Sequence, residues 1–149
     1  MAIKPDSIPV HAGFRSGQVC EVYNEAAFWH FLAVERSRAH RSQRFLYLVL
    51  VAIRESLGRS AKLTNTTSAA VFRGLGVSVR EVDFVGWYRE GHIAAAVLLQ
   101  GVKVSDAGVT PIIADRVRGE LKKGLTATEL KNLRVRVVRL GGTTKVRFP

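Results

Sequence analysis

The longest apolar run in the chain, FLYLVLVAI at Phe45–Ile53, most limits what this sequence can fold into. A membrane-spanning helix needs about 20 such residues, so this run is too short to cross a bilayer. A continuous apolar segment of this length with β-branched residues is typical of a strand that is covered on both faces. We therefore predict a central, fully buried strand at 45–53.

The other periodic segments predict alternating helices and strands. The last helix has Thr110 as its cap, Pro111 at its first position and Gly124 after its end, and TKVRFP predicts a closing strand after a Gly141–Gly142 turn. When the first expected helix, at 24–41, is set aside, the remaining order of elements is β-α-β-β-α-β. We therefore expect an α+β fold with a ferredoxin-like core and an extra N-terminal helix. The segments are helices at 24–41, 67–79 and 110–124 and strands at 45–53, 82–88, 93–99 and 133–140.

The length of 149 residues suits one domain. Residues 1–17 contain prolines and glycines without a period, so we expect a flexible leader, followed by a single domain at 18–149. The lone Cys20 forms no internal disulfide and no secretory signal is visible, which favours the cytoplasm. The histidines and Cys20 lack metal-ligand spacing, and we expect no metal and no cofactor.

The net charge of +11, from 23 basic and 12 acidic residues, favours polyanionic partners such as nucleic acid, nucleotides, lipid headgroups or an acidic protein face. The alternative explanation of this charge is solubility, because basic residues spread over the whole surface keep it well solvated. An RNA-binding sheet needs exposed aromatic residues on its strands. The strands expected at 45–53 and 93–99 are apolar and predicted to be buried, so nucleic-acid binding is the least favoured of the functions considered.

Three segments, in this order and spacing, resemble the GGDEF domains of diguanylate cyclases from Gly17 onward. They are NEAAFWHFLAVERSRAHRSQRFLYLVLVAI (24–53), REVDFVGWYREGHIAAAVLL (80–99) and IADRVRGEL (113–121). The first is similar to the opening helix and strand of the family, the second to its Arg-x-x-Asp pair and GGDEF hairpin, and the third to the helix that follows. The resemblance implies a bacterial signalling domain with the nucleotidyl-cyclase-like fold.

The resemblance also implies a site that has lost its chemistry. A diguanylate cyclase joins two GTP molecules with metal ions, which need carboxylate oxygens at the end of the first strand and in the hairpin. Here the strand positions hold Ala52, Ile53 and Arg54, and Gly91 stands at the hairpin position. We expect no catalytic residue and no enzymatic activity, and the tip itself suits a plain tight turn. The degenerate active-site loop consists of Arg89, Glu90, Gly91, His92 and Ile93.

A second family site, which binds the product, is matched by three residues of this chain. Arg80 and Asp83 stand five residues ahead of Arg89, and Arg116 lies in the following helix. An arginine can donate two hydrogen bonds to a guanine edge, and a carboxylate can accept from the opposite edge. The resemblance thus implies binding of cyclic di-GMP. The alternative is structural: an Asp before a strand often accepts from backbone N–H groups, and a surface pair with Arg80 contributes little.

A non-enzymatic interaction module without a nucleotide ligand is the main alternative function. Phe28, Trp29 and Phe31 occupy more than one face of the first predicted helix. Part of that helix is therefore available to pack against a protein partner or a second copy of the chain. A nucleic-acid-binding domain is the third alternative, and the sequence favours it least.

Overall fold

A mixed six-stranded sheet forms the centre of the computed structural model, which describes residues 7–15, 18–79, 83–99 and 106–141. The strand order is β1-β2-β4-β5-β3-β6; β2 runs parallel to β4, and the other neighbours are antiparallel. The strands are β1 (Ser7–Arg15), β2 (Gln18–Tyr23), β3 (Leu46–Ile53), β4 (Phe84–Arg89), β5 (Ile93–Leu99) and β6 (Leu133–Leu140). The helices are α1 (Glu25–Ser42), α2 (Asn65–Ser78), α3 (Asp106–Leu121) and α4 (Ala127–Lys131).

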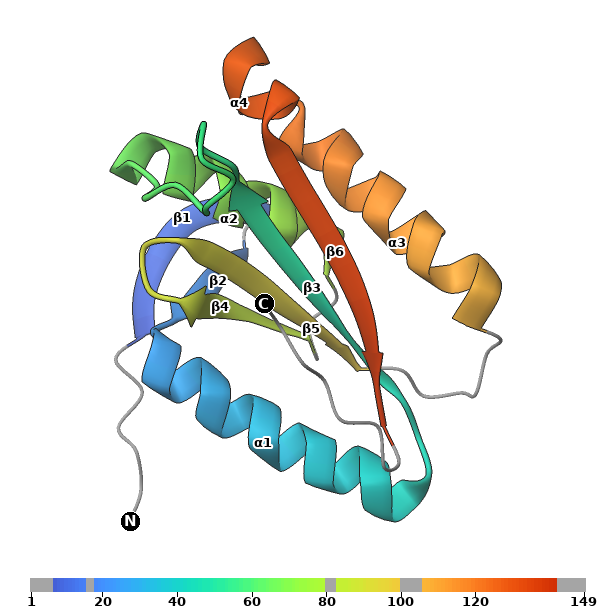
Figure 1. The fold of residues 1–149 in the computed structure, drawn as a ribbon. Helices are drawn as coiled ribbons and strands as arrows, with labels where there is room; N and C mark the ends of the chain where they lie inside the picture. Colours follow the sequence, from blue (N-terminus) through green and yellow to red (C-terminus); the bar gives the residue numbers. More distant parts are fainter. Residues whose placement is uncertain (1–6, 16–17, 80–82, 100–105, 142–149) are drawn as a thin grey trace.

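Helices cover both faces of this sheet (Figure 1). On one face, α1 packs Phe28 and Leu32 against alternate β3 residues such as Leu48. On the other face, α2 and α3 bury a larger core that includes Phe72 and Leu121. This arrangement leaves β3 buried on both faces, as its unbroken apolar sequence predicts.

Helix α1 begins and ends at residues whose chemistry fits those positions. The side chain of Asn24 accepts a hydrogen bond from the N–H of Ala27 at 2.8 Å and caps the first turn. Gln43 ends the helix in the left-handed conformation, with φ of 54°. The predicted helix at 24–41 is thereby confirmed.

No helix in the described part of the chain is both long and apolar enough to cross a membrane.

The predicted α+β class and ferredoxin-like core are confirmed. The four core strands lie in the order β4-β5-β3-β6, and α2 and α3 lie together on one face, as that topology requires. The strands expected at 45–53, 82–88, 93–99 and 133–140 are all present, with ends shifted by at most two residues. The closing strand expected in TKVRFP lies outside the described residues.

The segment expected to be a flexible leader contains a strand, because Ser7–Arg15 forms β1. It pairs antiparallel with β2, which places both strands beside β4. The leader was expected because this segment contains prolines, Pro9 among them, and glycines without a period. A proline is tolerated in a terminal strand or at an irregularity, and the register of β1 shifts between Pro9 and Phe14.

The predicted start of the third helix is also wrong, because α3 begins at Asp106 and not at the expected cap Thr110. Pro111 lies inside the helix. A proline inside a helix removes one hydrogen bond and crowds the carbonyl four residues earlier, so it favours a helix start, yet α3 continues through Pro111. The short helix α4 was not predicted. It is set by a capping box in which Thr126 and Glu129 each accept from the backbone N–H of the other.

Candidate functional site

The tip of the β4–β5 hairpin is a tight turn closed by a hydrogen bond. The N–H of His92 donates to the carbonyl of Arg89 at 3.0 Å. Gly91 has φ of 76°, a conformation that costs little only for glycine. The geometry of the turn therefore explains why a glycine stands at position 91, as expected for a plain tight turn.

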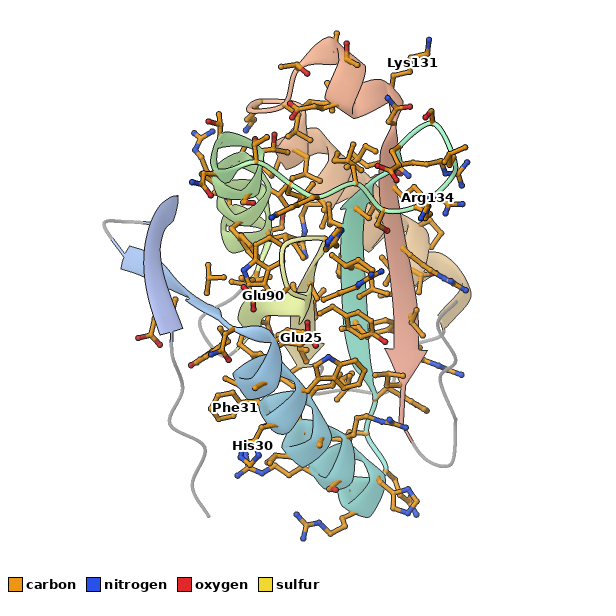
Figure 2. All side chains as sticks on the ribbon, turned by 60° about the vertical axis from the view of Figure 1, so that its left-hand side comes forward. Glu25, His30, Phe31, Glu90, Lys131 and Arg134 are labelled. Carbon is orange, nitrogen blue, oxygen red and sulfur yellow. The ribbon has the colours of Figure 1, made fainter. Side chains whose placement is uncertain are left out.

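The tip is attached to the start of α1 by two hydrogen bonds between glutamates. The N–H of Glu25 donates to the Glu90 carboxylate at 3.1 Å, and the N–H of Glu90 donates to the Glu25 carboxylate at 2.6 Å. Figure 2 shows the two residues side by side where α1 begins. A carboxylate is favourable at a helix N-terminus, where free N–H groups carry partial positive charge. Glu90 thus has a structural partner.

The opposite side of the tip contacts the connection between β3 and α2. The N–H of Leu63 donates to the carbonyl of Gly91 at 2.8 Å, and the His92 Nδ1 lies 3.2 Å from the carbonyl oxygen of Ser60. Of the degenerate loop, Arg89 is exposed and Ile93 is half-buried. The polar groups of the tip are thus largely engaged in holding the hairpin in place.

The residues at the metal-ligand positions of the resembled family do not fit a divalent cation. Ala52 and Arg54 lie on the α1 face of the sheet, whereas Ile53 is buried on the opposite face. Ala52, Ile53 and Gly91 offer no side-chain oxygen, and Arg54 carries the wrong charge. Among the described residues, no three His, Cys, Asp or Glu side chains gather in a way that could hold a metal ion.

The three residues expected to bind cyclic di-GMP are only partly described. Arg80 lies outside the described residues. Asp83 precedes β4, and its Oδ1 accepts a hydrogen bond from the N–H of Leu99 at 2.8 Å. Arg116 is exposed on α3. The bond to Leu99 is the kind of backbone contact that the structural alternative expects, and the ligand set remains a prediction.

A pocket of about 570 Å³ opens on the α1 face of the sheet, next to the hairpin and beyond the part that α1 covers. We call it the basic pocket. Its lining includes Leu50, Ala52 and Ile93 of the sheet and the aromatic Tyr88. Its cationic residues are Arg54, Arg118, Lys131, Arg134 and Arg136, and none of the described residues that line it is acidic.

The five cations of the basic pocket are exposed, and none forms an ion pair with a carboxylate in the described part of the chain. Figure 2 shows Lys131 and Arg134 in the part of the molecule opposite His30, with Lys131 at its end. Burial raises the pKa of Tyr88 to about 12. A tyrosine hydroxyl is neutral at physiological pH with or without this shift, so the pocket combines net positive charge with a neutral aromatic side chain.

Solved structures of GGDEF domains share this fold. The FimX GGDEF domain from Pseudomonas aeruginosa is 16% identical, with a TM-score of 0.57 over 84% of this chain and 79% of that chain. The GGDEF domain of PA1120 (TpbB or YfiN) from the same species is 18% identical, with a TM-score of 0.54 over 78% and 69%. That of DgcB from Caulobacter crescentus, in complex with c-di-GMP, is 15% identical, with a TM-score of 0.50 over 80% and 72%.

These similarities show that the chain has the GGDEF-domain fold, which confirms the resemblance found in the sequence at the level of structure. No protein-family model matches the sequence, and no curated protein matches it significantly. At identities of 15 to 18%, the fold is the property that the solved structures share with this chain.

Sequence reasoning missed the basic pocket. One signal was present: in LRVRVVRL, Arg134 and Arg136 are two residues apart and therefore share a face of β6. Lys131 lies just before that strand in the sequence, whereas Arg118 joins the set through the packing of α3 against β6, which no local pattern reveals.

Proposed function

We propose that this chain is a catalytically inactive signalling domain built on the GGDEF fold. The observation that carries the proposal is the identity of the residues at the metal-ligand positions. Ala52 and Gly91 provide no oxygen ligand, and Arg54 places a guanidinium at the end of β3. Mg²⁺ requires oxygen ligands to neutralise the phosphates of GTP, and these residues supply none.

Incubation with GTP and Mg²⁺ or Mn²⁺, followed by chromatography, tests the loss of activity. We expect no cyclic di-GMP above a blank without protein. Metal-dependent product that increases with protein concentration would contradict the proposal.

The ligand of this domain, in our proposal, is cyclic di-GMP, bound by Arg80, Asp83 and Arg116. Three points support it: the retained spacing of the three residues, the match of arginine and carboxylate to the edges of guanine, and the DgcB neighbour, which was solved in complex with c-di-GMP. A basic protein also attracts a dianionic ligand.

Titration calorimetry with cyclic di-GMP, and with GTP as the comparison ligand, tests this site. We expect binding of the dinucleotide only. Arg80→Ala should cost roughly 1–3 kcal/mol, or about tenfold or more in affinity, because a bidentate contact is lost. Arg73→Ala removes an exposed arginine of α2 and should leave binding unchanged.

Two results would contradict the receptor proposal. Absence of heat at high micromolar cyclic di-GMP would favour the interaction module without a nucleotide ligand. Equal binding by Arg80→Ala and the wild type would place the ligand elsewhere on the domain.

A further inference from the structure

An aromatic pair, made of an exposed tryptophan and a half-buried tyrosine, lies at the edge of the basic pocket. Trp29 of α1 is 42% exposed, and its ring centroid is 4.7 Å from that of Tyr88, which lines the pocket. The indole Nε1 donates to the carbonyl of Tyr88 at 2.9 Å, which fixes the orientation of the ring. A large aromatic surface is thus held open to solvent beside a cationic cavity.

The cations of the pocket come from several elements but gather at one site. Arg134 and Arg136 alternate along β6, and Arg54 follows the end of β3, where β3 pairs with β6. Lys131 ends α4, and Arg118 extends the set from α3. Because no described carboxylate neutralises them, their charges remain available to an anionic ligand.

We propose that the basic pocket and the Trp29–Tyr88 pair bind single-stranded nucleic acid. The arginines and Lys131 contact backbone phosphates through charge-assisted hydrogen bonds, and an unpaired base stacks on Trp29. Cationic grooves with aromatic stacking surfaces are the usual means of binding single strands. This goes beyond the proposed function, since it uses none of Arg80, Asp83 and Arg116.

The shape of the site favours a single strand over a duplex. A cavity of about 570 Å³ falls in the range of small-ligand sites and can admit an unpaired nucleotide. The bases of a duplex are stacked and paired inside the helix, so they cannot reach Trp29 without being extruded. A free polyphosphate would use the cations but would gain nothing from the indole.

Fluorescence anisotropy with a labelled 12-nucleotide oligouridine tests the proposal. We expect binding without added Mg²⁺ that weakens as salt rises. Trp29→Ala should weaken it about 5- to 100-fold through loss of stacking, and Trp29→Phe should largely restore it. Replacing Arg134 and Arg136 together by Gln should weaken binding at least tenfold, whereas Arg73→Gln on α2 should have little effect.

Several outcomes would overturn the proposal. Absence of binding would do so directly. If Arg73→Gln lost as much oligouridine affinity as the pocket variants, binding would depend on the overall charge of the protein. If a duplex bound with equal affinity, an unpaired base would not stack on Trp29. Pyrophosphate could also displace the oligonucleotide completely and bind with the same affinity, while Trp29→Ala changes nothing. That result would identify a site for free phosphate. Thermal melting of every variant separates these results from unfolding, and cyclic di-GMP titrations test the other site independently.

Discussion

The hairpin tip and the basic pocket adjoin one another, yet their charged residues are used differently. At the tip, the Glu90 carboxylate and the backbone of Gly91 each bond to another segment of the chain. In the basic pocket, Arg54 and Arg134 have no described acidic partner. Charges at the tip therefore contribute to the fold, whereas those of the pocket remain available for a ligand. Substitutions in the two regions should accordingly change different measured quantities.

The largest expected effect is on binding by the basic pocket. Arg54→Glu combined with Arg134→Glu should lower oligouridine affinity by about 100-fold or more, because each charged hydrogen bond contributes about 1.5–3 kcal/mol. Loss of two phosphate contacts should reduce the salt slope by roughly 1.4. Both side chains are exposed, so the melting temperature should change little. If the melting temperature of this variant also fell strongly, the pocket arginines would contribute to folding as the tip residues do, and the two regions would not differ.

The tip should show the opposite behaviour. Gly91→Ala places a Cβ in open space but forces alanine into a positive φ, so we expect a loss of about 1–2 kcal/mol in unfolding free energy. Gly119→Ala is a matched control in α3, where the added Cβ also meets nothing. It should stabilise the protein by about 0.5–1 kcal/mol. Urea denaturation measures both, and oligouridine affinity should be unchanged in each.

The contact between the tip and α1 should have a smaller effect. Glu90→Gln keeps the shape of the side chain but removes the negative charge at the helix N-terminus, which we expect to cost about 0.3–1 kcal/mol. Glu55→Gln is the control, because among the described residues its carboxylate has a single ion-pair contact, with Arg59 at 3.9 Å. If urea denaturation shows equal losses for both, the Glu90 contact adds no stability.

The smallest effect should appear in the pH dependence of stability. The Thr67 hydroxyl and the Thr126 N–H hold the pKa of Glu129 below its ordinary 4.5. Glu129 therefore stabilises the fold above that pH, and the contribution is lost as pH falls through the lowered pKa. Glu129→Gln should show a smaller drop in melting temperature between pH 7 and pH 3 than the wild type. A drop as large as that of wild type would mean that this carboxylate is not linked to folding.

Most of the core elements could be predicted because local patterns determine them. Asn24 caps α1, and the apolar run at 45–53 requires burial on both faces. The start of α3 was missed because a proline suggests a helix start without requiring one. The short helix α4 had a readable signal in Thr126-x-x-Glu129.

The sites were less predictable than the fold. The resemblance drew attention to the positions that it matches, such as Ala52 and Gly91, and these carry the proposal of an inactive domain. The basic pocket depends on which helices pack beside β6, and the exposure of Trp29 depends on how α1 crosses the sheet. Spatial neighbours of this kind, separated in sequence, have no local periodic pattern that reveals them.

The parallel pairing of β2 with β4 has a consequence for how the chain can be shortened. Val22 and Tyr23 pair with Val85 and Gly86, so β2 covers backbone groups of β4 that would otherwise be open. A chain that begins at Asn24 would lose the buried Val22 together with this pairing and would expose the edge of β4. Unpaired strand edges recruit other strands, so we expect the shortened protein to self-associate through β4. In the full chain, β2 occupies that edge.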